Sequence, residues 1–363
     1  MRHRLLTASA LALLLVVLGS WASPASAQLV IESKDGKNNL KIGFLVQGQF
    51  EAITTPDGNA IGTNVFLRRI RLMFGGKVTD KFTYFIDTDS PNLGKAAANG
   101  TKDAGTIYIQ DAFVTYNHSA DFKVDVGMML LAQSHNHIQS AASLLPVDYG
   151  AYSFTESTPM GERVGRDYGV QLRGLPFKQH FEYRLGVFQG LRGADSRNPL
   201  RIAGRATWFP FAAEAGYFYT GTFQGSKRLV AVGASFDKQG AYGMYGLDFF
   251  WEEPINKGQS GVTVQVDWNR INGGTFVTAL APQHTLLIEG AGHFATGKVS
   301  VFGQYSKHTY DNPLTPGQYA YAVGVAYWIG GHNRTLKASI GRQHTDGQPN
   351  RTQFLLQLQA FYF

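Results

Sequence analysis

Side chains alternate between apolar and polar with a period of two along most of this chain. Between Lys41 and Glu51 the even positions are apolar or glycine, and most odd positions are polar. The same alternation returns at residues 82–87, 122–128, 262–269 and 298–306. A period of two is typical of β-strands with one apolar and one polar face. No run of eighteen apolar residues follows residue 27, so the sequence predicts an all-β protein with no transmembrane helix.

Composition narrows the chemistry that the chain can perform. It has no cysteine, which excludes disulfide scaffolds, thiolate metal sites and thiol nucleophiles. His135 and His137 could form half of a metal site, but a solvated or gating loop is the favoured interpretation because no carboxylate is near them in sequence. The consecutive residues Asn117, His118 and Ser119 lie in a turn, where their side chains do not converge as catalysis requires. We therefore expect no catalytic residue, no bound metal and no cofactor.

The N-terminus has the pattern of a secretory signal peptide. Arg2 and Arg4 precede an apolar stretch at residues 11–18, and Ala25-Ser26-Ala27 forms a small-x-small cleavage site. This pattern predicts a signal peptide over residues 1–27 and a single exported domain over residues 28–363. The mature positive charge is spread along the chain without a clustered patch, so nucleic acid is not an expected partner.

Two architectures fit many short amphipathic strands: a soluble sandwich or barrel, and a transmembrane β-barrel. The aromatic pairs Trp208-Phe209 and Tyr327-Trp328 at strand ends, the leader, and the terminal Phe363 favour the transmembrane barrel. One feature departs from the usual closing strand, because Gln357 and Gln359 share the face of Phe363. The expected location is the outer membrane of a Gram-negative bacterium.

The number of strands follows from the spacing of the turns. Seventeen segments alternate as strands do: about 40–52, 65–77, 81–89, 106–117, 122–130, 166–175, 180–189, 200–208, 213–223, 228–238, 241–251, 261–270, 284–294, 297–307, 319–329, 334–343 and 351–363. Bacterial barrels have even numbers of strands, so one segment must be assigned wrongly. Strand directions counted forward from the N-terminus and backward from Phe363 disagree between residues 228 and 270, so the wrong assignment is expected there. The sequence predicts 16 strands around an aqueous channel, with 18 as the alternative.

Three segments carry a resemblance to a known family. Residues 66–76 (FLRRIRLMFGG), 82–87 (FTYFID) and 109–116 (IQDAFVTY) resemble the second, third and fourth strands of the phosphate-selective porin O and P family. The resemblance implies a trimeric 16-stranded channel with a long third loop folded into the lumen, which here is residues 131–164. That loop contains no lysine, a departure that bears on phosphate specificity and not on the porin class.

The strand alternation places several basic residues on the polar face, which in a barrel lines the lumen. We expect these to line the pore and bind anions: Arg69, Arg71, Lys123, Arg173, Arg184, Arg201 and Arg205. In the alternative interpretation, they pair with acidic residues of the same face (Asp87, Asp111, Asp167 and Glu182) and stiffen the wall.

The function predicted is a porin for passive diffusion of small hydrophilic solutes, with a preference for anions such as phosphate or similar oxyanions. Its expected partners are outer-membrane lipid, the diffusing solutes and two further copies in a homotrimer. A non-selective porin, a soluble or surface ligand-binding β-protein and a barrel enzyme remain as alternatives.

Overall fold

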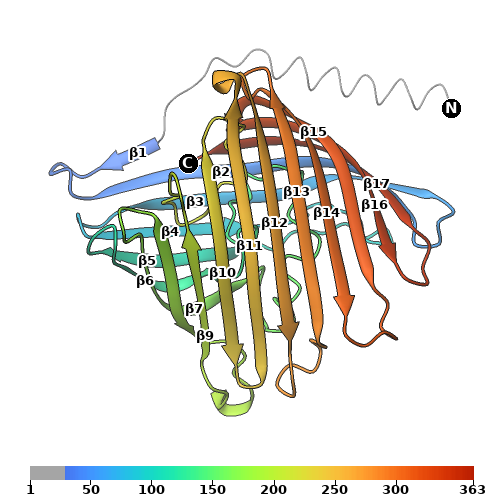
Figure 1. Cartoon of the computed structure of the whole chain (residues 1–363), viewed down its shortest axis with the longest axis horizontal. Coiled ribbons are helices and arrows are strands. Elements are labelled where there is room, and N and C mark those ends of the chain that lie inside the picture. Colours follow the sequence, from blue (N-terminus) through green and yellow to red (C-terminus); the bar gives the residue numbers. More distant parts are fainter. Residues whose placement is uncertain (1–28) are drawn as a thin grey trace.

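The chain forms one antiparallel sheet that closes into a barrel (Figure 1). The computed structural model describes residues 29–363, so the predicted signal peptide 1–27 lies outside the described residues. Within residues 29–363 the strands are β1 (Leu29–Glu32), β2 (Asn39–Thr54), β3 (Ile61–Lys77), β4 (Phe82–Asp89), β5 (Tyr108–Asn117), β6 (Lys123–Leu130), β7 (Arg166–Gly174), β8 (Phe181–Phe188), β9 (Arg201–Trp208), β10 (Leu229–Gln239), β11 (Tyr242–Ile255), β12 (Ser260–Asn272), β13 (Gln283–Phe294), β14 (Val299–Tyr310), β15 (Gln318–His332), β16 (Arg334–Thr345) and β17 (Arg351–Tyr362). Two short 3₁₀ turns, η1 (Ala194–Ser196) and η2 (Asn256–Gly258), interrupt the connections. In this part of the chain, no helix has the length and apolar character to cross a membrane.

The barrel closes between its first and last long strands. β2 pairs with β3 along one edge and with β17 along the other, where Phe44 faces Tyr362 and Ala52 faces Phe354. The sixteen strands β2–β17 therefore form the closed ring, as the sequence predicts. β1 is additional: it pairs only with the first residues of β2, from Asn39 to Ile42.

The outer face of the barrel is apolar and the inner face is polar. Leu72, Val126 and Leu247 point outward and are about half exposed, whereas Arg69, Asp87 and Asp125 point inward and are buried. Trp208 and Tyr327 also point outward, but their neighbours Phe209 and Trp328 are buried inside. An apolar band with aromatic residues near its edges is the surface that a barrel presents to lipid.

The connections differ at the two ends of the barrel. One end, here the turn end, has short connections such as residues 78–81 and 118–122, and the chain terminates there at Phe363. The other end, here the loop end, carries the long connections 90–107, 131–165 and 189–200. Residues 209–228 are the exception, because this long connection belongs to the turn end.

The segment assigned wrongly as a strand is residues 213–223. The error was expected between residues 228 and 270, and the structure places it before that range. This segment alternates as a strand does, but it pairs with no neighbour along the sheet. Its one bridge is a parallel pairing of Tyr219 with Gln139, inside the barrel. β9 pairs directly with β10, so the ring bypasses the segment.

Candidate functional site

Residues 131–165 cross the lumen and are held to its wall by side chains of the inward-facing positions. Gln47 Nε2 donates to the carbonyl of Ala141 at 3.1 Å, and Gln359 Nε2 donates to that of Ala142 at 2.8 Å. Lys337, on β16, donates to the carbonyls of Leu144 and Pro146. Gln357 and Gln359 therefore face inward as the alternation indicated, and their amides are anchors for this segment.

The connection 209–228 enters the lumen from the turn end and meets the first segment. Tyr219 N donates to Ile138 O at 2.9 Å, and Ser140 N donates to Tyr219 O at 2.8 Å. The Tyr219 ring is fully buried, and its hydroxyl donates to Glu182 on β8. Arg184 Nη1 donates to the carbonyl of Tyr217 at 2.9 Å. The two segments thus support each other across the middle of the barrel.

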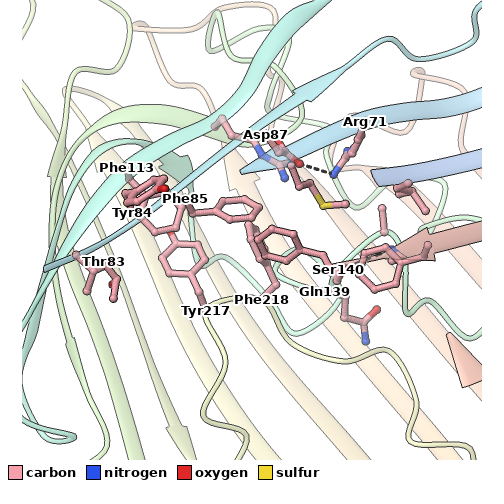
Figure 2. A pocket seen from close by; sticks show the side chains of 18 of the residues that line it. Arg71, Thr83, Tyr84, Phe85, Asp87, Phe113, Gln139, Ser140, Tyr217 and Phe218 are labelled. Carbon is pink, nitrogen blue, oxygen red and sulfur yellow. Dashed lines mark hydrogen bonds and ion pairs between the residues drawn. The ribbon is translucent and has the colours of Figure 1, made fainter. Parts of the chain in front are cut away.

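Two cavities remain open beside these segments. The first has a volume of about 380 Å³ and lies toward the turn end, bordered by Phe85, Tyr217 and Phe218 (Figure 2). The second has a volume of about 520 Å³ and is bordered by Gln49 and Tyr108 among others. Arg71, Tyr149 and Arg166 border both cavities, so they lie at the boundary between them, here called the neck.

Asp148 joins two arginines beside this neck. Its carboxylate accepts from Arg68 Nε at 2.6 Å and from Arg69 Nη2 at 2.7 Å. Burial alone would raise the pKa of Asp148, but the two guanidiniums hold it well below its usual range. The carboxylate therefore stays charged and offsets part of the positive charge at the neck.

A β-bulge explains why Arg68 takes part. Arg69 pairs with Gln47, but Leu67 pairs with Gly48, so Arg68 is an extra residue in β3. Strict alternation would have placed Arg68 on the lipid face with Ile70 and Leu72. Arg68 was not among the predicted residues, because alternation alone carries no signal for a bulge.

Arg71 and Arg166, which reach the neck itself, are also paired with carboxylates. Arg71 Nη2 lies 2.8 Å from Asp89, and its Nη1 lies 3.4 Å from Asp87, as Figure 2 shows for the second pair. Arg166 lies 3.2 Å from Asp111. Arg166 was not among the predicted residues, because the alternation of β7 places even positions such as Tyr168 and Val170 on the outer face, and Arg166 departs from it at the first residue of the strand.

The other predicted basic residues lie at different depths. Arg173 borders the first cavity and pairs with Asp125 at 2.7 Å, and Lys123 is half-buried on the neighbouring β6. Arg184, Arg201 and Arg205 border neither cavity. These three are buried beneath the lumenal segments, where they pair with Glu182, Asp237 and Asp248, respectively. These ion pairs agree with the alternative interpretation, in which the inward arginines pair with acidic residues of the same face and stiffen the wall.

The buried pair Arg205–Asp248 gives a stability prediction. Both side chains are fully buried. Arg205→Met should lower the free energy of unfolding by about 3–5 kcal/mol, because it leaves the Asp248 carboxylate without a counter-ion. Arg205→Met combined with Asp248→Leu should recover most of that loss. Urea unfolding in lipid vesicles, followed by tryptophan fluorescence, measures both changes.

The exposed pair Arg197–Asp195 provides the matched control, since its side chains are 82% and 71% exposed. Arg197→Met should leave the unfolding midpoint unchanged. If Arg205→Met also left the unfolding midpoint unchanged, the buried pair would contribute nothing to stability.

The two histidines of the lumenal segment are buried, which contradicts the solvated alternative of the predicted solvated or gating loop, and gating stays a prediction. His137 Nε2 lies 3.3 Å from Glu156, and the His135 ring stacks on Phe250 with 4.3 Å between ring centroids. The folded segment brings these partners to the histidines from distant positions in the sequence. Among residues 29–363, no group of three or more His, Asp or Glu side chains is arranged to hold a metal ion.

Comparisons with known proteins agree with this architecture. A family model described as phosphate-selective porin O and P matches residues 40–248. No curated protein sequence matches the chain. Among solved structures, Salmonella typhi OmpF in complex with daunomycin has a TM-score of 0.63 at 12% identity, over 92% of this chain and 100% of that one.

Two further structures are similar at comparable levels. An anion-selective porin from Comamonas acidovorans has a TM-score of 0.58 at 9% identity, over 90% of this chain and 100% of that one. The outer membrane protein OmpT of Vibrio cholerae, in a trimer form, has a TM-score of 0.57 at 9% identity with the same coverage. At these identities the similarity concerns the fold.

Proposed function

Since this chain belongs to the phosphate-selective porin O and P family, we propose that its channel passes small hydrophilic solutes by passive diffusion, with a modest preference for anions. The family makes it an outer-membrane porin, and the two cavities and their neck are the passage in this proposal. The segment 131–165 acts as the constriction, because it crosses the lumen and its Tyr149 borders the neck.

One observation carries the anion preference. The lumen-facing cations that border the two cavities are Arg68, Arg69, Arg71, Lys95, Arg166 and Arg173, and the carboxylates that border them are Glu51, Asp87, Asp89 and Asp148. Cations thus outnumber the carboxylates that border the passage, while Asp111 and Asp125, the counter-ions of Arg166 and Arg173, lie behind its lining. A narrow, low-dielectric passage concentrates such an excess, whereas a wide lumen would screen it.

A general porin without selectivity is the second candidate. It is favoured by the pairing itself, since each of the arginines at the neck has a carboxylate within 3.4 Å. Of the seven predicted anion-binding residues, the proposal retains Arg69, Arg71 and Arg173 along the passage. It assigns Arg184, Arg201 and Arg205 to anchoring the lumenal segments, and Lys123 to the mouth at the turn end.

Further parts of the proposal concern assembly and location. Residues 1–27 direct export, the turn end faces the periplasm and the loop end faces outward, as is usual for bacterial barrels. Three copies assemble into a homotrimer, as the trimer form of the similar Vibrio cholerae protein suggests for this fold. As a diffusion channel, the protein leaves its solutes chemically unchanged and uses no catalytic residue.

Reversal potentials in a potassium chloride gradient across a planar bilayer test the proposal. The wild-type channel should favour chloride over potassium by about two to one at low salt, and less at high salt. Arg69→Ala combined with Arg71→Ala should abolish or reverse the preference, because Asp87 and Asp89 then lose Arg71 and Asp148 keeps only Arg68. Closure in three equal steps would support the trimer.

Arg228→Ala is the matched control, since Arg228 is exposed and borders neither cavity. It should leave the reversal potential unchanged. A wild-type channel that favours potassium would refute the anion preference and assign the arginines to wall pairing. Absence of conductance from assembled barrels would refute the channel.

A further inference from the structure

The first cavity is lined by aromatic rings where a porin wall is usually polar. Phe85 on β4, Phe113 on β5 and Phe361 on β17 point inward, although Ile86, Val114 and Tyr362 already supply these strands with apolar outward side chains. Tyr217 and Phe218 of the connection 209–228 add to the lining (Figure 2). The terminal Phe363 completes it. Contact with lipid explains the outward aromatic side chains but not these inward ones, which face the lumen.

The ring of the terminal Phe363 packs against two glycines on the lumen side of the wall. Phe363 shares the inward face of Gln357 and Gln359, and its ring lies against β2 and β3. A Cβ at Gly43 would lie 2.6 Å from Phe363 Cδ2, and one at Gly75 would lie 2.8 Å from Phe363 Cζ. Two glycines on adjacent strands thus leave room for the ring on the lumen side.

The rings touch each other without closing the cavity. The Phe85 ring centroid lies 5.6 Å from that of Phe218 and 5.5 Å from that of Phe363, both in edge-to-face geometry. All three rings remain only half-buried and border a space of about 380 Å³. Apolar faces exposed to a water-filled passage are a surface that a ligand can cover.

Positive charge borders the same space. The guanidiniums of Arg71, Arg166 and Arg173 line it, against the single carboxylate of Asp87. Arg173 donates to Asp125 from Nε and Nη2, and within residues 29–363 its Nη1 has no hydrogen-bond partner. An arginine with spare donors next to aromatic faces can bind a carboxylate whose attached ring stacks beside it.

We propose that the first cavity is a binding subsite for a small anion that carries one aromatic ring. The anionic group lies toward Arg173 and Arg71, and the ring lies among Phe85, Phe218 and Phe363. The volume accommodates a single-ring molecule with its hydrating water. This inference rests on the proposed channel, because the solute reaches the cavity through the neck.

Block of the chloride current in planar bilayers tests the subsite, with benzoate, acetate and benzyl alcohol as probes. Benzoate should halve the current at a concentration roughly tenfold lower than acetate or benzyl alcohol does, since only benzoate combines charge and ring. Equal potency of benzoate and acetate would overturn the subsite while leaving the channel intact. Absence of any chloride current would instead refute the channel itself.

Leucine variants locate the site. Phe218→Leu should raise the half-blocking concentration of benzoate about fivefold, because it removes one aromatic face while keeping an apolar side chain. Phe85→Leu, on the wall, should act in the same direction and serves as the second variant should the first disturb its segment. Phe223→Leu is the matched control, because Phe223 belongs to the same connection but borders neither cavity. An equal response of Phe218→Leu and Phe223→Leu would overturn the assignment to this cavity.

Discussion

Deleting residues 139–157 should raise the single-channel conductance about threefold, because these residues fill the middle of a 16-stranded barrel whose empty lumen would be a wide aqueous pore. The structure adds a reason for a large effect. Ser140 N also donates to Tyr219 O, so the deletion removes one of the two backbone hydrogen bonds between Tyr219 and the first lumenal segment. Conductance of assembled barrels in planar bilayers measures the change.

A matched deletion of residues 312–316 should leave the conductance unchanged, since this connection at the loop end is largely exposed and borders neither cavity. Deleting residues 213–223 together with 139–157 should give a larger conductance than either deletion alone. An assembled barrel whose conductance does not respond to the first deletion would show that residues 139–157 do not limit the current.

Asp148→Asn should increase the preference for chloride severalfold. The substitution removes the carboxylate that accepts from both Arg68 and Arg69, and leaves two uncompensated guanidiniums beside the neck. A passage narrower than the screening length of roughly 8 Å would transmit this change to the permeating ions. Reversal potentials at low salt measure it, with Asp57→Asn in an exposed turn as the control.

The same group gives a pH prediction with a definite sign. The two guanidiniums depress the pKa of Asp148, so the carboxylate remains charged as the pH falls through the range in which an ordinary aspartate is protonated. Wild-type selectivity should therefore gain no Asp148-dependent anion preference between pH 7 and about 4. A step near pH 4 that disappears in Asp148→Asn would contradict the strong coupling of these three residues.

Alternation predicted which way most side chains point, and hence most of the barrel. Arg69, Arg71 and Arg173 face inward as expected, and Tyr168, Leu185 and Ile202 face outward. Even the unusual placement of Gln357 and Gln359 with Phe363 was readable in the sequence. The structure supplied its meaning: the amides hold the lumenal segment 131–165, and the ring lines a cavity.

The sequence by itself determined most of the strands and their two faces, because a period of two is a local property of the chain. The aromatic pairs, the leader and Phe363 favoured a transmembrane barrel over a soluble one. Tertiary structure alone decided which strand-like segment stays out of the sheet, since residues 213–223 alternate correctly but find their partner at residues 138–140 inside the lumen. It also decided which charges meet. Asp148 binds arginines about eighty residues away, and Arg68 reaches it only through a bulge. Such contacts depend on where the closed barrel brings distant side chains together, which local alternation does not encode.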